Sequence, residues 1–190
     1  MKIEDFTKGV NDWNNHLFLL WLALAETDGD VVELGCGDGS TVQLHDYCKL
    51  NQRNLFSFDT DLEWLNKYKE CESLTHSFTL VNNWDLVKNM CPNPSVVLVD
   101  HAPGERRIED VKIYANAAEV LVLHDTQPQP TAAGYEYEKI WDLFKYRVDL
   151  TVPMNREVDP PDNRTWASMV SNKIDITKYK GLSFGEYTIK

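Results

Sequence analysis

Apolar residues change their spacing along the chain, and this change separates one predicted helix from a series of predicted strands. In the N-terminal part they recur at steps of three and four, which is the period of an amphipathic helix. The recurring residues are Val10, Trp13, Leu17, Leu20, Trp21 and Leu24. We therefore predict an N-terminal helix whose apolar side, including both tryptophans, packs into the core.

Short apolar runs then predict strands that alternate with helices. The runs are DVVELG (30–35), NLFSFD (54–59), SFTLV (77–81), SVVLVD (95–100) and EVLVLHD (119–125). Helical stretches are predicted near 40–50, 62–72, 84–90, 105–117 and 135–145. This alternation favours a parallel sheet with helices on both faces. The continuously apolar VVLV and VLVL runs are typical of strands buried on both faces.

The C-terminal part has a different pattern. YRVDLTV (146–152) and TWASMVS (165–171) are both strand-like, and the Pro-rich segment between them has no helical period. We predict that they form an antiparallel pair at one edge of the sheet. The fold class is thus α/β, with a doubly wound, mostly parallel sheet preceded by a helix.

The length of the chain favours a single domain. With 190 residues and no internal repeat, it is long enough to bury one full core. We divide residues 1–190 into an N-terminal helical segment (1–29), a ligand-binding core (30–126), and a C-terminal part with a helix and the strand pair (127–190).

The turn after the first strand is rich in glycine. In VVELGCGDGST (31–41), glycines stand at positions 35, 37 and 39. Glycine has a conformational cost, so the pattern indicates that another group approaches this backbone closely. Such a turn also exposes N–H groups at the start of a helix. Asp59, 20 residues after Gly39, ends the second strand and is suited to accept hydrogen bonds from ribose hydroxyls. A ligand containing a nucleoside is therefore predicted.

Two carboxylates near the loop narrow the choice of nucleoside. Glu33 and Asp38 would repel a pyrophosphate, but they would attract an ammonium or sulfonium group. In addition, Ser40 stands where the dinucleotide fingerprint G-x-G-x-x-G requires its third glycine. S-adenosylmethionine combines a ribose with both kinds of cation, so it is the favoured ligand.

These motifs resemble those of a known family. VVELGCGDGST resembles the first motif of the class I S-adenosylmethionine-dependent methyltransferases, and LFSFDTD (55–61) is similar to their second. The resemblance covers about residues 30–126 and implies a Rossmann-like sheet. It also implies that Glu33 and the backbone of 35–39 hold the methionine part, while Asp59 holds the ribose. The cofactor-binding set expected here is Glu33, Gly35, Cys36, Gly37, Asp38, Gly39, Ser40, Asp59, Asn83, Trp84 and Asp100.

The third strand departs from the family pattern. The acidic residue that contacts the adenine amino group in the family falls within LVNNWDLV (80–87). Asn83 is the nearest equivalent, while stacking by Trp84 or substitution by Asp85 are alternatives. The adenine contact therefore stays open between these three residues.

The fourth and fifth strand ends carry candidate catalytic residues. LVDHAPGERR (98–107) and LVLHDT (121–126) resemble strand ends of a methyltransferase subgroup with a terminal HDT. We predict one catalytic cluster of Asp100, His101, His124 and Asp125, in which a histidine is the base and a carboxylate orients it. Magnesium held by the two aspartates is an alternative, by resemblance to metal-dependent O-methyltransferases. It is not favoured, because the histidines can move the proton unaided, and no metal ligand is assigned.

Net charge and cysteine usage add expectations about partners and location. The formal net charge of −11 disfavours a nucleic-acid surface, so we expect a non-nucleic-acid acceptor with a hydroxyl or amine, and no nucleic-acid partner. The four cysteines show neither metal-type spacing nor a disulfide framework, which favours a reducing, cytoplasmic compartment. The apolar run LFLLWLALA (17–25) is too short for a membrane span, which needs ~20 residues.

Several other residues have weaker indications. Arg106 and Arg107 are typical of a solvated helix face, although they could clamp an anionic group. Asn15 and His16 could cover the cofactor, whereas His45 and His76 have no recognisable context. Packing roles are assigned to Trp64, Trp141 and Trp166, and acceptor-shaping roles to the segments 126–134 and 153–165.

Two functions of other classes compete with methyl transfer. An NAD-linked oxidoreductase would use a similar glycine turn, but Ser40 and Asp38 oppose it. A non-catalytic, nucleoside-binding module of methyltransferase-like fold is the second alternative. Ionisable residues at two strand ends argue against it.

Overall fold

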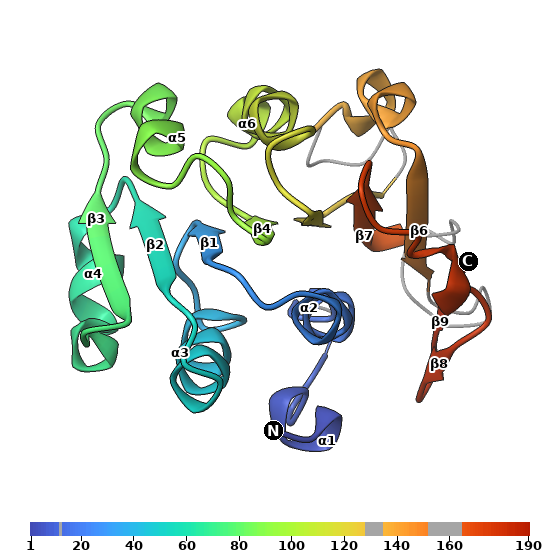
Figure 1. Cartoon of the computed structure of the whole chain (residues 1–190), viewed down its shortest axis with the longest axis horizontal. Helices are drawn as coiled ribbons and strands as arrows, with labels where there is room; N and C mark the ends of the chain where they lie inside the picture. Colours follow the sequence, from blue (N-terminus) through green and yellow to red (C-terminus); the bar gives the residue numbers. More distant parts are fainter. Residues whose placement is uncertain (12, 128–134, 152–164) are drawn as a thin grey trace.

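A nine-stranded sheet organises the chain in the computed structural model, which describes residues 1–11, 13–127, 135–151 and 165–190 (Figure 1). Of residues 165 and 166 only the backbone is described. The strand order is β3-β2-β1-β4-β5-β7-β6-β9-β8. The parallel strands are β1 (Val31–Leu34), β2 (Leu55–Asp59), β3 (His76–Leu80), β4 (Val96–Val99) and β5 (Val120–His124). The order reverses between β1 and β4, and in such sheets ligands bind beyond the carboxyl ends of the strands at that point.

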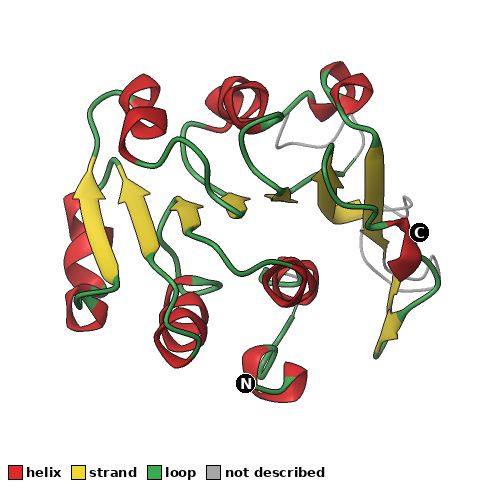
Figure 2. Cartoon of the chain, viewed as in Figure 1, coloured by secondary structure: helices red, strands yellow, loops and turns green. Residues whose placement is uncertain are grey.

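Helices cover both faces of the parallel part (Figure 2). They are α1 (Ile3–Phe6), α2 (His16–Glu26), α3 (Thr41–Leu50), α4 (Leu62–Lys67), α5 (Val87–Met90) and α6 (Arg107–Tyr114). Figure 1 shows α2 and α3 on one face and α5 and α6 on the other. The predicted α/β fold with a mostly parallel sheet is therefore confirmed.

Alternate residues of the central strands point to opposite faces. In β4, the side chains of Val96 and Leu98 join the core under α2 and α3, whereas those of Val97 and Val99 join the core under α5 and α6. All four are fully buried. This period of two continues past the strand ends and decides which side chains can meet there.

The C-terminal strands extend the sheet beyond β5. The predicted antiparallel pair is present as β6 (Tyr146–Thr151) and β7 (Thr165–Ser171), with β7 also antiparallel to β5. Two short strands that were not predicted, β8 (Ser183–Phe184) and β9 (Tyr187–Ile189), form the outer edge beside β6. The β6–β7 pair therefore does not form the edge of the sheet itself, because β9 and β8 follow it.

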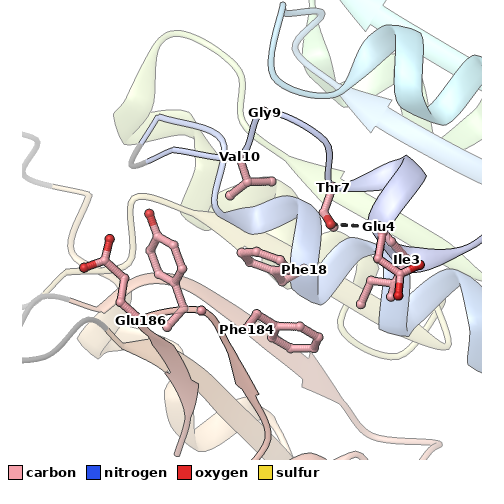
Figure 3. A pocket seen from close by; sticks show the side chains of 10 residues that line it. Ile3, Glu4, Thr7, Gly9, Val10, Phe18, Phe184 and Glu186 are labelled. Carbon is pink, nitrogen blue, oxygen red and sulfur yellow. Dashed lines mark hydrogen bonds between the residues drawn. The ribbon is translucent and has the colours of Figure 1, made fainter.

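The N-terminal helix differs from the prediction. It begins at His16, and Trp13 lies before it with 85% of its surface exposed, so the prediction that Trp13 belongs to the core is wrong. Phe18 of α2 stacks on Phe184 of β8, with ring centroids 4.6 Å apart. Both rings line a groove of about 510 Å³ between the N-terminal segment and the β8–β9 turn. Figure 3 shows their side chains in this pocket.

The structure also bears on the helix predicted at 135–145, on membrane spans and on the two acceptor-shaping segments. The predicted helix at 135–145 is absent from its described residues, which form two 3-10 turns at Tyr137–Lys139 and Trp141–Leu143. No helix in the described part of the chain is long and apolar enough to cross a bilayer. The two proposed acceptor-shaping segments lie almost wholly outside the described residues, as does the side chain of Trp166.

Candidate functional site at the carboxyl ends of the parallel strands

The first glycine of the loop accommodates a neighbouring strand end. Gly35 has a φ of +95°, a conformation that favours glycine. A Cβ atom at this position would lie 2.6 Å from the carbonyl oxygen of Asp100 and 2.7 Å from Cα of His101. The close approach that the glycine permits is therefore between the ends of β1 and β4.

The other two glycines differ in what surrounds them. A Cβ at Gly39 would lie 3.1 Å from Cβ of Asn14 and 3.4 Å from Cε1 of His16, so the N-terminal segment covers this part of the loop. A Cβ at Gly37 would meet nothing closer than 3.9 Å. Of the three, Gly37 leaves open space beside its backbone, which is where a ligand can approach.

Glu33 supports the loop from inside. Its carboxylate is fully buried and accepts hydrogen bonds from the hydroxyls of Ser40 (2.6 Å), Thr41 (3.0 Å) and Ser57 (2.6 Å). Burial raises the pKa of Glu33 to about 7, against the effect of these hydrogen bonds. The expectation that Glu33 and Ser40 face the ligand is corrected, because in this structure both side chains join the loop to the sheet.

Two histidines without sequence context extend this network. Nε2 of His76 lies 2.9 Å from the hydroxyl of Ser57, and Nδ1 of His45 lies 3.1 Å from Nδ1 of His76. Burial, helped by His45, lowers the pKa of His76 to about 3, so its ring is neutral. A consistent donor order then runs from His45 to His76, to Ser57 and to the carboxylate of Glu33.

Asp59 lies beside the glycine loop, as predicted. Its Oδ2 accepts a hydrogen bond from the backbone N–H of Cys36 (2.8 Å), and its Oδ1 accepts one from the N–H of Asp61 (2.8 Å). Each carboxylate oxygen has a second lone pair, so Asp59 can still accept from two ligand hydroxyls. Burial raises the pKa of the Cys36 thiol, which leaves that side chain a neutral packing group.

Asp38 points toward α4, where its carboxylate is paired with a lysine. Its carboxylate is exposed and contacts Nζ of Lys67 (2.6 Å) and the hydroxyl of Tyr68 (2.6 Å). These hydrogen bonds lower the pKa of Asp38. The expected attraction of Asp38 for a cationic ligand is therefore offset by the ammonium group of Lys67.

The residues expected to contact adenine have other partners. Asn83 caps a 3-10 turn (Trp84–Leu86) by accepting a hydrogen bond from the N–H of Asp85 (2.9 Å), whose own carboxylate pairs with Arg106 (2.6 Å). Trp84 is buried, and its ring stacks on that of His101 at 4.2 Å. The expectation that Trp84 stacks on a ligand is corrected, because the core covers it.

At the ends of β4 and β5, an arginine joins the two predicted carboxylates. Arg107 is buried and lies 3.0 Å from Oδ1 of Asp100 and 3.2 Å from Oδ2 of Asp125. Its guanidinium also stacks on Tyr135 at 4.4 Å. The prediction of a solvated face is wrong for Arg107. The Asp100–Asp125 pair does not fit magnesium, since the guanidinium occupies the position of a bridging cation.

The predicted cluster of four residues is divided by the sheet. His124 contacts Asp100, with Nδ1 to Oδ1 at 3.0 Å. His101 belongs to the other face, where its ring packs on Trp84 and its Nε2 lies 2.9 Å from Oδ2 of Asp110. Adjacent residues at a strand end point to opposite faces, so the prediction is wrong for His101.

His16 takes the place expected of His101. Its ring lies 4.5 Å from the ring of His124, and it is completely buried. Burial and the nearby His124 lower the pKa of His16 to about 3. Burial also lowers the pKa of His124, but the carboxylates of Asp100 and Asp125 outweigh it and raise this pKa overall. One neutral and one readily protonated imidazole therefore face each other.

Comparison with known proteins identifies the fold and leaves the reaction open. No protein-family model and no curated protein sequence matches the chain. Solved structures with similar folds include a precorrin-6Y C5,15-methyltransferase C-terminal domain from Rhodobacter capsulatus, with a TM-score of 0.56 and 10% identity over 86% of this chain and 91% of that one. A spermidine synthase from Thermotoga maritima has a TM-score of 0.54 and 14% identity over 81% and 56% of the two chains.

An rRNA methylase from Streptococcus thermophilus corrects one expectation. It has a TM-score of 0.55 and 14% identity, covering 82% of this chain and 95% of that one. A protein of the same fold thus modifies RNA, so the exclusion of nucleic acid that we based on a net charge of −11 is wrong. The overall charge of a chain does not report the charge around one site.

Proposed function

We propose that the chain is an S-adenosylmethionine-dependent methyltransferase. The observation that carries this proposal is the hydrogen bond from the Cys36 N–H to Asp59, which joins the glycine turn and the ribose-type carboxylate in one unit. The likeness of the fold to methyltransferases supports it, and so does the resemblance of VVELGCGDGST to their first motif.

The cofactor would bind on the open side of Gly37. There the backbone permits close approach, while the free lone pairs of Asp59 accept the ribose hydroxyls. Glu33 would act indirectly by holding Ser40 and Thr41, and so fix the loop against which the methionine part lies. Asn83, near the end of β3, remains the proposed neighbour of the adenine.

The Asp100–His124 pair would activate the acceptor. When bound, S-adenosylmethionine supplies its methyl group to the lone pair of an acceptor oxygen or nitrogen as the carbon–sulfur bond breaks. In the proposed reaction, Nε2 of His124 removes the acceptor proton, while Asp100 holds Nδ1–H and so fixes the tautomer. Arg107 keeps both carboxylates in position. Alignment of acceptor and methyl group supplies most of the remaining acceleration.

The raised pKa of His124 gives this role a pH dependence. A base must be unprotonated, so activity should rise with pH through a value above the ordinary 6.5. The acceptor is stated here only by its reacting atom, a hydroxyl oxygen or an amine nitrogen.

Transfer of a radiolabelled methyl group tests the proposal. The protein would be incubated with labelled S-adenosylmethionine and separate pools of metabolites, peptides, RNA and DNA. We expect label in one pool. In His124→Asn the rate of transfer to that pool should fall by roughly 10²–10⁴-fold. Leu74→Ala, at a fully exposed position, is the matched control and should retain activity. Cofactor binding without transfer to any pool would favour the non-catalytic module instead.

A further inference from the structure

Three side chains that can ligate a metal meet from three separate segments of the chain. His16 is the first residue of α2, Asp100 follows β4, and His124 ends β5. One ligating atom from each lies within 4.8 Å of the other two. Ligand atoms of one tetrahedral Zn²⁺ lie about 3.4 Å apart, so binding would draw these side chains closer together.

Three of the four ring nitrogens in this group lack the partners that buried polar atoms normally have. Both ring nitrogens of His16, and Nε2 of His124, are buried without a hydrogen-bond partner among the described residues. Asn15, adjacent to His16, is also fully buried, and neither atom of its amide group has a partner. Unpartnered atoms also occur elsewhere in the described residues, but here five of them belong to three residues, two of which can ligate a metal, and this favours a ligand at this place.

We propose that His16, Asp100 and His124 bind a divalent transition-metal ion such as Zn²⁺. Two imidazole nitrogens and one carboxylate oxygen are a common ligand set for Zn²⁺ and Fe²⁺ sites that keep open positions. Mg²⁺ prefers oxygen ligands alone, so this set disfavours it. The site differs from the Asp100–Asp125 pair, where Arg107 takes the place of a cation.

The surroundings of Asp100 are compatible with such an ion. His124 and Arg107 both contact its Oδ1, and no described residue is hydrogen-bonded to Oδ2, which leaves that oxygen for the metal. With His124 unprotonated, as a metal ligand must be, Asp100 and Asp125 outweigh the single charge of Arg107, so the site attracts a cation. One quarter of the Asp100 side chain is exposed, which gives the ion access.

The proposed ion would lie next to the glycine loop, because Cε1 of His16 is 3.4 Å from the position that a Cβ atom at Gly39 would occupy. With the ion bound, His124 is a ligand and no longer the base, and the ion could bind an acceptor hydroxyl and lower its pKa instead. The role of His124 as a base then applies to the metal-free chain. The catalytic role of the ion rests on the proposed function, whereas binding of the ion does not.

Metal titration of the full chain tests the site directly. The protein, produced without a histidine tag and stripped with a chelator, would be titrated with Zn²⁺ by calorimetry, and with Co²⁺ by visible absorption. Cys71, which is only partly buried, would be replaced by serine throughout to prevent binding to a thiolate. We expect one ion per chain, Co²⁺ bands without sulfur charge transfer, and no comparable binding of Mg²⁺.

Variants then identify the ligands. His16→Ala and His124→Ala should each weaken Zn²⁺ binding by at least 10–100-fold. His45→Gln is the matched control, because it changes a buried histidine that also faces a second histidine, and it should bind as the parent does. Circular dichroism of each variant would verify folding.

Two results would overturn the site: a parent chain that binds Zn²⁺ no more tightly than His16→Ala, or an equal loss in His45→Gln. The metal-free protein would be titrated in parallel with S-adenosylmethionine. Failure to bind Zn²⁺ with intact cofactor binding rejects only the metal site, whereas the reverse pattern rejects only the proposed cofactor.

Discussion

Two buried polar clusters lie on the same face of the sheet, and they differ in how completely their atoms are hydrogen-bonded. In the cluster around Glu33, both carboxylate oxygens have hydroxyl donors, and the chain of partners continues to His76. In the cluster of His16, Asp100 and His124, three ring nitrogens lack described partners. Hydrogen bonds within the chain satisfy the first cluster, whereas the second has buried ring nitrogens that a ligand would engage.

Gly35 is the point where the two clusters meet. Its backbone carries the strand of Glu33 into the loop and touches the backbone of Asp100. The molecule therefore has three kinds of position here. They are the close backbone contact at Gly35, the fully hydrogen-bonded cluster around Glu33, and the incompletely hydrogen-bonded cluster of His16, Asp100 and His124. Substitutions in each should have effects of different size.

The largest loss of stability is expected at Gly35, where the clusters meet. Gly35→Ala would place a Cβ 2.6 Å from the Asp100 carbonyl oxygen, in a backbone conformation that alanine rarely adopts. We expect a loss of roughly 3–5 kcal/mol in the free energy of unfolding. Urea denaturation would measure it. The matched control is Gly37→Ala, which meets open space and should change stability by less than ~1 kcal/mol. Equal losses would contradict the assigned contact.

The next effect concerns the satisfied cluster and depends on pH. The pKa of Glu33 rises from an ordinary 4.5 to about 7 on folding, so between these values the folded chain holds a proton that the unfolded chain has lost. Stability should therefore fall as pH rises from 4.5 to 7. Glu33→Gln removes this contribution. The free energy of unfolding of the variant, relative to that of the parent, should therefore increase by on the order of 3 kcal/mol between pH 4.5 and pH 7. A difference that stays constant with pH would show that Glu33 does not titrate there.

A smaller effect, on cofactor binding, is expected at Asp59 beside the glycine loop. Asp59→Ala removes the carboxylate acceptor for the ribose, and it should weaken binding of S-adenosylmethionine by more than ~1 kcal/mol. Calorimetry would measure the loss, with Leu74→Ala as the control. Because Asp59 also holds the Cys36 N–H, Asp59→Asn is needed to separate the two roles. It retains one acceptor oxygen and should lose less affinity than Asp59→Ala.

The smallest effect on stability is expected in the unsatisfied cluster. In metal-free protein, His16→Leu removes two buried nitrogens without partners, so it should be neutral or slightly stabilising. Ser57→Ala in the satisfied cluster is the comparison, and it should cost about 1 kcal/mol because two hydrogen bonds are lost. Thermal unfolding in the presence of a chelator measures both. A larger loss for His16→Leu would erase the proposed difference between the clusters.

The sheet could be predicted because its signals are local. Apolar runs such as VVLV identify strands that are buried on both faces, and Gly35 and Asp59 fall at strand ends that the pattern marks. The same period of two could have separated His101 from Asp100, since neighbours on a strand point to opposite faces. The sequence pattern contained that information, but the prediction of a four-residue cluster did not use it.

Other features depend on packing between distant segments. His16 meets His124 only because α2 packs against β5, and Arg107 reaches Asp100 and Asp125 only because of where α6 begins. No local spacing reports these contacts. Trp13 had the correct helical period and yet lies outside the helix, because apolar periodicity does not fix where a helix starts.

Calorimetric titration of the metal-free protein with S-adenosylmethionine, S-adenosylhomocysteine and NAD measures which nucleoside ligand the glycine loop binds. We expect both adenosyl sulfur compounds to bind at one site per chain, and NAD to bind much more weakly. Gly37→Leu, which fills the open side of the loop, should abolish binding while the chain stays folded. Binding of NAD as tight as that of S-adenosylmethionine, or unchanged binding in Gly37→Leu, would contradict this expectation.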